Sequence, residues 1–323
     1  MNEKWKANMD TSSRIVSLLP SATEMLFALG LGDQVVAVSH ACDYPKEVQH
    51  KPRATFSRID SSQSSAAIDV AVHHQLSTGK PLYEIDVPLL AQLQFDLIIT
   101  QSQCEVCAVQ YTDVVAAIDQ LDRTKQTSIL TLHPHSLEEV FEDLIRIGQI
   151  CGIKQYAESK VKDYRRRVAT IVESLHQLRE EDRPRTAMIE WIDPLMLAGN
   201  WMPELLRLAG GRGPSLDTVG KSLVTTWNAL REFNPQIMVL CPCGFDLPRT
   251  CHEASELEQR PDFLSLQAVC AGSVYAVDGN AYFNRSGPRL VESLEILAHL
   301  LHPQQIGPPR LPAPTETAWR KIY

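Results

Sequence analysis

The chain has 323 residues, 44% of them hydrophobic and 22% charged, which is enough apolar material for one large domain or two of ordinary size. The formal net charge is -8, and the longest run of lysine and arginine is the three residues Arg165–Arg167. Because counterion-release binding to nucleic acid needs a basic face, we expect no nucleic-acid partner. We also expect no membrane span and no secretory leader, which indicates a cytoplasmic protein, or a periplasmic one only if a leader has been removed.

The first half of the chain alternates short β-branched runs with helical patterns, which is typical of parallel α/β architecture. The expected strands are residues 14–19, 35–38, 96–100 and 128–132. A helix is expected after the first strand, with Ser21 and Glu24 as its capping box. A second capping box, Ser136 with Glu139, predicts another helix after the fourth strand.

Residues 153–181 contain neither glycine nor proline and carry apolar side chains near helical spacing among many charges. This pattern predicts one helix of about 40 Å, at about 1.5 Å per residue. Since a small lobe does not need a helix of that length, we expect residues 152–182 to join two lobes.

The α/β pattern restarts after Pro184, with expected strands at residues 185–190, 236–240 and 273–277. We therefore predict an α/β protein with two Rossmann-like lobes, each with a parallel-sheet core, over residues 14–151 and 183–303. The two lobes are joined by the long helix. Residues 1–13 are expected to be a disordered tail and residues 304–323 a C-terminal extension.

The residues that follow the expected strands are unusual for loops. Ligands of parallel α/β sheets bind beyond the carboxyl ends of the strands, and loops usually favour Gly, Pro, Asn, Asp and Ser. Here these segments hold most of the chain's 8 cysteines, together with histidines and aromatic residues. This predicts a ligand cleft between the two lobes that is lined by thiol, imidazole and aromatic groups.

Cysteine and histidine side chains in these loops form a candidate metal set. Its members are Cys42, Cys104, Cys107, Cys241, Cys243 and His135. Cys104 and Cys107 have the CxxC spacing of metal and redox sites; two buried loop cysteines, or a disulfide in an exported protein, are the alternatives. If these side chains lie close together in the fold, they would hold zinc, iron or an iron–sulfur species, or one of them would bind the cobalt of a corrinoid through its thiolate or imidazole.

Two segments of the sequence resemble a known family. Residues 14–24, with Asp43-Tyr44-Pro45 downstream, are similar to the opening of the cobalamin- and siderophore-binding proteins of ABC importers, and residues 283–289 resemble their closing motif. The resemblance covers residues 14–303 and is nearest to the cobalamin-binding subgroup. It implies two lobes joined by a rigid helix, with a tetrapyrrole-like or metal-chelate ligand between them, here cobalamin or a related corrinoid.

The ligand-binding candidates come from the loops after the strands and from the family motifs. They are Pro20, Ser21, His40, Tyr44, Gln103, Glu190, Trp191, Trp201, Phe245, Tyr282, Phe283 and Arg285. Aromatic side chains in this set would give a planar macrocycle flat apolar walls, with a few polar anchors beside them. Glu190 would anchor the ligand or pair with Arg285 or Arg289, and Trp201 fits a core position equally well.

Family members that dock on a permease carry a glutamate on each lobe, at the positions that we align with Pro88 and Asn284. Both charges are missing here. An ABC permease therefore stays open as the partner, and a role as a carrier or buffer of the ligand is the alternative.

Enzymatic templates are poorly matched, because the sequence has no nucleophile elbow, zinc-protease motif, P-loop or dinucleotide fingerprint. Three functions remain. We expect the first, corrinoid binding, and hence no enzyme. The second is metal, siderophore or iron–sulfur binding through the cysteine and histidine set. The third is a thiol-dependent redox enzyme, with Cys42 and His40 as a candidate nucleophile and base.

Overall fold

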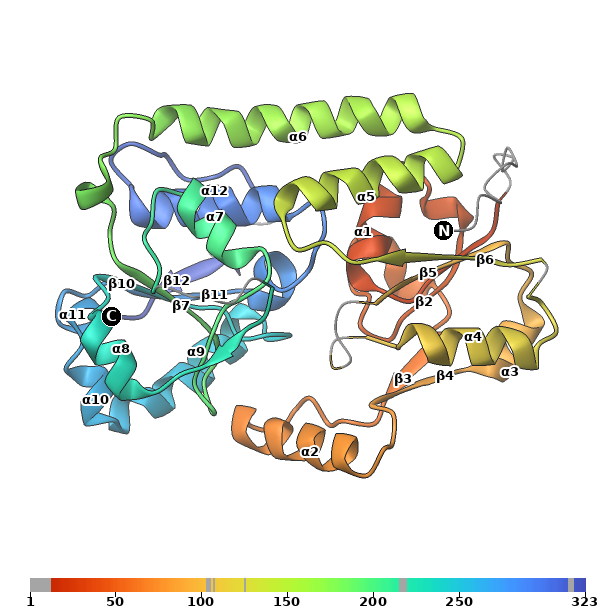
Figure 1. Cartoon of the computed structure of the whole chain (residues 1–323), viewed down its shortest axis with the longest axis horizontal. Coiled ribbons are helices and arrows are strands. Elements are labelled where there is room, and N and C mark those ends of the chain that lie inside the picture. The colour runs from red at the N-terminus through yellow and green to blue at the C-terminus, as the bar shows by residue number, and fades with distance from the viewer. Residues whose placement is uncertain (1–12, 103–105, 107, 125, 215–219, 313–316) are drawn as a thin grey trace. The chain divides into compact units, whose positions relative to one another are not determined.

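The computed structural model shows two compact units (Figure 1). It describes residues 13–102, 106, 108–124, 126–214, 220–312 and 317–323. The first unit comprises residues 1–61, 71–134 and 138–163, and the second comprises residues 62–70, 135–137 and 164–323. The predicted tail, residues 1–13, lies outside the described residues except for Ser13. Within the described ranges, no helix is both long and apolar enough to cross a membrane.

The first unit is built on a four-stranded parallel sheet with the order β2-β1-β5-β6. Val16 of the central strand β1 pairs with Ala37 on one side and with Ile98 on the other. The bounds are β1 Ile15–Ser17, β2 Val35–Val38, β5 Leu97–Gln101 and β6 Ser128–Leu132. All four strands lie where the apolar runs predicted them, because strands covered by helices on both faces consist of buried, largely β-branched residues. The accompanying helices are α1 Pro20–Ala28, α3 Val87–Gln92, α4 Tyr111–Gln120 and α5 Leu137–Ile150 (Figure 1).

The predicted capping box of the first helix is wrong. Helix α1 begins at Pro20, its N-cap is Leu19, and no side chain caps it. Ser21 and Glu24 lie inside the helix and are 2% and 3% exposed. Proline at the first helical position explains the shift, since it fixes φ and has no N–H that would need a cap.

A long excursion separates β2 from α3. It leaves the unit through β3 (Thr55–Ser57), forms helix α2 (Ser65–Ser77) and returns through β4 (Tyr83–Ile85). β3 and β4 pair antiparallel, with Phe56 opposite Glu84. The two-stranded hairpin at the base of this excursion was not predicted.

The second unit is built on a six-stranded sheet with the order β12-β11-β10-β7-β8-β9. Its centre is parallel, as predicted, with Met238 of β10 between Ala187 of β7 and Val274 of β11. The other three strands run antiparallel, and one of them, β12, comes from the predicted C-terminal extension and pairs with β11. The bounds are β7 Thr186–Trp191, β8 Met196–Leu197, β9 Leu223–Val224, β10 Ile237–Leu240, β11 Val274–Val277 and β12 Trp319–Lys321.

Short helices connect these strands, and one longer helix covers the sheet. The helices are α7 Met202–Leu208, α8 Trp227–Phe233, α9 Leu247–Ser255, α10 Pro261–Leu264, α11 Gln267–Cys270 and α12 Leu290–Leu301. Single turns of other helix types lie at Gly32–Gln34, Lys46–His50, Glu180–Asp182, Glu256–Gln259 and Gly279–Phe283.

Helix α6 (Lys154–Ser174) begins in the first unit and ends in the second. It is shorter than the predicted 152–182, because the chain turns after Ser174 before the Glu180–Asp182 turn. In the first unit it packs closely on α5: a Cβ at Gly148 would lie 2.4 Å from the Cβ of Ala157, so glycine is required there.

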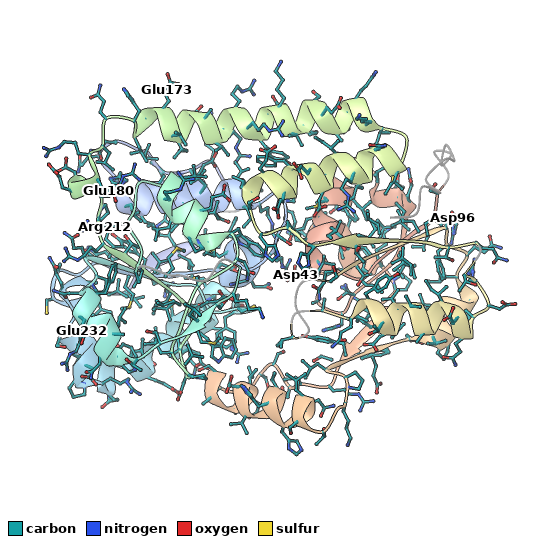
Figure 2. All side chains as sticks on the ribbon, viewed as in Figure 1. Asp43, Asp96, Glu173, Glu180, Arg212 and Glu232 are labelled. Carbon is teal, nitrogen blue, oxygen red and sulfur yellow. The ribbon has the colours of Figure 1, made fainter. Side chains whose placement is uncertain are left out.

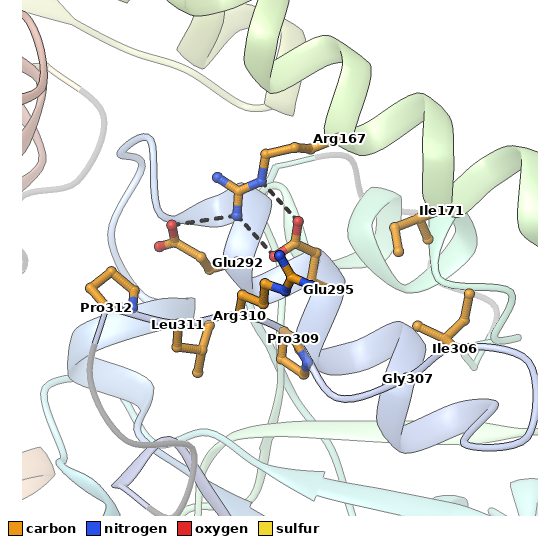
Figure 3. Close-up of a pocket in the computed structure, with 10 residues that line it drawn as sticks. All are labelled: Arg167, Ile171, Glu292, Glu295, Ile306, Gly307, Pro309, Arg310, Leu311 and Pro312. Atoms are coloured by element: carbon orange, nitrogen blue, oxygen red, sulfur yellow. Dashed lines mark hydrogen bonds and ion pairs between the residues drawn. The ribbon is translucent and has the colours of Figure 1, made fainter.

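An ion-pair cluster holds the second half of α6 to α12 (Figure 3). The Nε and Nη2 atoms of Arg167 each donate to one oxygen of Glu295, both at 2.8 Å, and Nη2 also lies 3.5 Å from Glu292. Glu292 is 8% exposed, and burial raises its pKa to about 7 despite Arg167 and Arg289. Its Oε2 atom is buried with no hydrogen-bond partner among the described residues. The pair with Glu295 is therefore the favourable one, and a charged Glu292 is costly.

We predict that Glu292→Gln stabilises the protein at alkaline pH. A carboxyl whose pKa is raised by folding binds more protons in the folded state, so the free energy of unfolding falls as pH rises through the folded pKa. With a pKa of about 7 for Glu292, this loss is about 1 to 3 kcal/mol between about pH 5 and about pH 8. Urea unfolding of the Glu292→Gln variant at both pH values should show most of this dependence removed.

Glu295→Gln is the matched control, because it weakens the bidentate pair with Arg167 instead. It should lower stability at both pH values. An equal loss of stability in the Glu292→Gln variant at pH 8 would contradict the prediction.

Candidate functional site

The loops after the four strands of the first sheet leave from one edge, because the strands are parallel. Figure 2 labels Asp43 in the loop beyond β2 and Asp96 before β5, at the opposite ends of these strands. The loop of residues 39–45 is held by Arg53, whose Nη1 donates to the carbonyl oxygens of Ser39 at 3.1 Å and Cys42 at 2.5 Å. These bonds fix the segment in which His40 and Tyr44 were predicted to bind ligand.

His40 is the best-defined polar group at this edge. Its backbone N–H donates to Thr55 Oγ1 at 3.0 Å, and its Nδ1 lies 2.8 Å from the same oxygen. A hydroxyl oxygen has two acceptor lone pairs as well as one proton, so Thr55 can orient the ring in either tautomer. Burial, and then Arg53, lower the pKa of His40, so the ring is neutral at pH 7. The half-buried imidazole therefore offers a neutral nitrogen, Nε2, as a donor or an acceptor.

Tyr83 belongs to the same group, although the sequence did not point to it. Its ring stacks on His40, with ring centroids 5.3 Å apart and planes inclined by 29°. The hydroxyl of Tyr83 donates to the carbonyl of Val106 at 2.6 Å. Nearby in the sequence, Thr100 Oγ1 donates to the carbonyl of Val109 at 3.3 Å. Tyr83 thus joins the β4 hairpin to the loop of the CxxC pair. Gln103, Cys104 and Cys107 themselves lie outside the described residues.

The remaining candidates of the first unit are more enclosed. Cys42 is 1% exposed, and its Sγ lies 3.1 Å from Thr23 Oγ1. Ser21 is also buried, while Pro20 and Tyr44 are half-buried. Cys42 is therefore placed as a packed thiol rather than an accessible nucleophile.

In the second unit, the central strands β7, β10 and β11 end at residues 191, 240 and 277. Glu190 and Trp191 are the last two residues of β7, and the other predicted residues follow β10 and β11 or lie in the loop after β8. Glu190 is deeply placed: its Oε2 accepts from the backbone N–H of Gly199 at 3.2 Å and from Ser222 Oγ at 2.7 Å. Burial is the main cause that raises the pKa of its carboxyl. The alternative salt bridge to Arg285 or Arg289 is not formed; Arg285 donates to Asn280 Oδ1 at 2.7 Å.

Trp191 and Phe245 form what we call the ring wall. Their ring centroids are 5.3 Å apart with planes at 53°. Phe245 is 2% exposed, whereas Trp191 is half-buried and presents part of its ring. The indole nitrogen of Trp191 is buried and has no partner among the described residues. The wall therefore combines an apolar surface with an unused hydrogen-bond donor.

Other predicted aromatic residues build the loops instead of lining them. Trp201 is 7% exposed, and its indole N–H donates to the carbonyl of Phe283 at 2.9 Å, which is the core role left open by the sequence. Phe283, Tyr282 and Arg285 are 0%, 4% and 9% exposed. Asn284, aligned with a docking glutamate, turns its amide toward the carbonyls of Gly279 and Cys241. These side chains fix the segment after β11.

The two thiols of this edge differ in burial. Cys241 is fully buried, and burial, followed by Glu190 and Cys243, raises its pKa well above the ordinary value. Cys243 is half-buried next to it. In the described part of the chain, no three His, Cys, Asp or Glu side chains are placed to hold a metal ion. His135 lies near Gly220, at 3.4 Å from its Cβ position. The metal set as a whole stays a prediction, because Cys104 and Cys107 belong to it.

Comparisons with known proteins agree on the class of this chain. The sequence model of the family described as "Periplasmic binding protein" matches residues 15–281. The chain is 27% identical over 297 residues to the uncharacterized ABC transporter substrate-binding lipoprotein YvrC of Bacillus subtilis, covering 90% of this chain and 80% of that protein.

Solved structures resemble the chain along most of its length. The periplasmic vitamin B12 binding protein BtuF of Vibrio cholerae superposes with a TM-score of 0.65 at 20% identity, covering 90% of this chain and 97% of that chain. A periplasmic heme binding protein of Pseudomonas aeruginosa superposes with a TM-score of 0.69 at 20% identity, covering 93% of this chain and 96% of that chain. These likenesses show a two-lobed α/β fold with parallel sheet cores.

We predict that the cysteines differ strongly in alkylation rate. Iodoacetamide reacts with thiolates, so a buried thiol with a raised pKa reacts only when the structure opens. In the native protein at about pH 8, exposed Cys270 should be modified first and Cys241 at least about 100-fold more slowly. Peptide mass spectrometry over a time course measures each rate, and urea-unfolded protein, in which the rates should converge, is the control. Rapid labelling of Cys241 in the native protein would show that its thiol is accessible.

Proposed function

The chain belongs to the periplasmic binding protein family, and we propose that it binds a corrinoid of the cobalamin type. The observation that carries the proposal is a pair of rings at the carboxyl edge of each sheet: His40 with Tyr83 in the first unit, and Trp191 with Phe245 in the second. Flat rings beside a few polar groups suit a large planar ligand. The family and its structural neighbours are substrate-binding proteins, which confirms the expectation that the chain is not an enzyme.

The polar groups at both edges fit a ligand with amide side chains. His40 offers a neutral imidazole nitrogen, and the indole N–H of Trp191 has no partner among the described residues. A donor that stays unpaired when buried is unfavourable, so a ligand that supplies an acceptor is favoured. Support also comes from the likeness to BtuF, which is a vitamin B12 binding protein. The ligand cleft between the lobes stays a prediction.

Haem is the second candidate. His40 and Tyr83 lie together, and both are side chains of the kinds that ligate haem iron. The similar Pseudomonas aeruginosa structure is of a heme binding protein. Because Nδ1 of His40 contacts Thr55, Nε2 is the nitrogen that would ligate iron.

Proteins of this family deliver small-molecule ligands to ABC permeases. For this chain we propose a role as a ligand carrier or buffer, with delivery to a permease as the alternative. We also propose the cytoplasmic location that was expected from the sequence. Immunoblotting of cytoplasmic and periplasmic fractions tests the location, and co-purification with a membrane permease would favour delivery.

We predict that hydroxocobalamin binds the purified full chain with a spectral change and that the ring wall contributes strongly. Trp191→Ala should weaken binding about 10-fold, since an aromatic stacking contact is worth about 0.5–1.5 kcal/mol and buried area adds to it. His40→Ala should weaken it by a similar factor through the lost hydrogen bond. Absorbance titration measures both affinities.

Tyr156→Ala is the matched control, because this aromatic residue on α6 is 47% exposed and belongs to neither ring pair. Its affinity should equal that of the unchanged protein. Parallel titration with hemin decides between the two ligands. Tight binding of hemin with no binding of hydroxocobalamin would refute the corrinoid proposal.

A further inference from the structure

Residues 62–70 of the excursion between β3 and β4 belong to the second unit, where the first turn of α2 is bonded to α9. The backbone N–H of Ser65 lies 3.3 Å from both carboxylate oxygens of Glu253, and its hydroxyl donates to Oε2 at 2.9 Å. Both residues are buried, at 2% and 4% exposure, and lie 188 positions apart in the sequence. Hydrogen bonds to a charged acceptor are stronger than neutral ones, more so when water is excluded.

Ser65 is the most enclosed residue of α2. Of its 13 residues, Ser65 alone is buried among those described. Val70 is 68% exposed and Leu76 is 38% exposed, although both are apolar. An isolated helix of this length is marginal in water, and most helical stability in proteins comes from packing. The contact between Ser65 and Glu253 therefore contributes to holding the start of α2.

A second tie leads from the same excursion to the ring wall. The guanidinium of Arg249, one turn before Glu253 on α9, donates to the carbonyl oxygen of Gln63. Its Cζ atom also lies 3.9 Å from the ring centroid of Phe245, in the ring wall. A planar guanidinium can stack through its face while it donates in its plane. One side chain thus contacts both the excursion and the candidate ligand surface.

Helix α9 is fixed where these contacts start. Asp246 is its N-cap, and its carboxylate accepts from the backbone N–H of Arg249 at 2.9 Å. The backbone N–H of Asn280 donates to the carbonyl of Phe245 at 3.0 Å. The backbone next to Phe245 is therefore held by hydrogen bonds, so a change at this place would involve the side-chain torsions of Arg249 and Phe245.

We propose that residues 62–70 of the second unit are a latch, fastened by Glu253 and Arg249, and that its fastening is coupled to ligand occupancy at the ring wall. A ligand that stacks on Trp191 restricts the ring of Phe245, and this favours the guanidinium geometry that reaches Gln63. By linkage, the fastened latch must tighten ligand binding by the same factor. Arg249 and Glu253 are positioning residues in this scheme. The coupling rests on the proposed function, whereas the fastening itself does not.

Hydrogen exchange of the full chain without ligand tests the fastening. Glu253→Gln keeps the size of the side chain but leaves one acceptor oxygen for the two donors of Ser65. Exchange at residues 62–70 should accelerate by about 10-fold or more, with β10 and β11 unchanged. The matched control is Glu256→Gln, an exposed acid at the C-cap of the same helix, which should leave exchange unaltered. Equal exchange in the Glu253→Gln variant and the unchanged protein would overturn the latch.

The coupling is tested with Arg249→Lys, which keeps the charge but removes the planar stacking on Phe245. Without ligand, this variant should also accelerate exchange at residues 62–70. With hydroxocobalamin as the probe, exchange at 62–70 of the unchanged protein should slow. With the probe bound, exchange at residues 62–70 of both variants should stay about 5-fold or more faster than in the unchanged protein, which is within the usual range of coupling between two sites.

The outcomes separate the two proposals. If hydroxocobalamin does not bind, the proposed function fails, and the exchange data of the two variants alone decide the latch. Suppose that the probe binds, but that residues 62–70 of the Glu253→Gln variant and of the unchanged protein then exchange at the same rate. The coupling is then overturned, even if the variant exchanges faster without the probe. Unchanged exchange in Arg249→Lys would equally overturn the route through the ring wall.

Discussion

Strand direction is the constraint on which the candidate site depends. In a parallel sheet each strand must return by a crossover, so all the loops that follow strands leave from one edge. The four strands of the first sheet and the three central strands of the second obey this rule. The antiparallel strands β8, β9 and β12 lie at the two sides of the second sheet. They do not separate the parallel strands β7, β10 and β11, whose carboxyl ends therefore stay next to one another. His40, Glu190 and Trp191 are therefore at carboxyl edges because of topology.

Burial then divides the residues of each edge into supports and accessible groups. Trp201 and Phe283 lock the loop after β11 through one hydrogen bond, and Arg53 locks the loop after β2 through two. A binding surface that is rigid before the ligand arrives loses less entropy on binding. The half-buried residues, His40 and Trp191 among them, are presented on loops that are already fixed. The supports thus affect affinity without touching the ligand.

The strands of both sheet centres could be predicted because each is a short run of buried, β-branched residues with no competing pattern. The residues at their carboxyl ends followed directly, including His40 after β2 and the pair Glu190–Trp191 at the end of β7. The β3–β4 hairpin could not be predicted, since each strand has three residues and only Thr55 among the six is buried. Tyr83 was missed for that reason. The contact of Ser65 with Glu253 joins distant positions and leaves no local signal. The sequence around Trp201 and Trp191 does not distinguish the two residues. Only their burial in the folded protein shows that the indole of Trp201 supports the loop and that the indole of Trp191 is partly accessible.

The charge state of the described edge groups bears on the choice of ligand. Burial keeps the Cys241 thiol and the Glu190 carboxyl toward their neutral forms, and it keeps the His40 ring neutral as well. Thiol coordination of a metal needs thiolates, so the desolvation that protects Cys241 also opposes its use as a ligand atom. What these groups offer is hydrogen bonding with little fixed charge. Neutral hydrogen-bonding groups on a ligand match such a surface. Carboxylate groups on a ligand would instead need the cations near the edges, and Arg53, Arg249 and Arg285 are each already hydrogen-bonded within the protein.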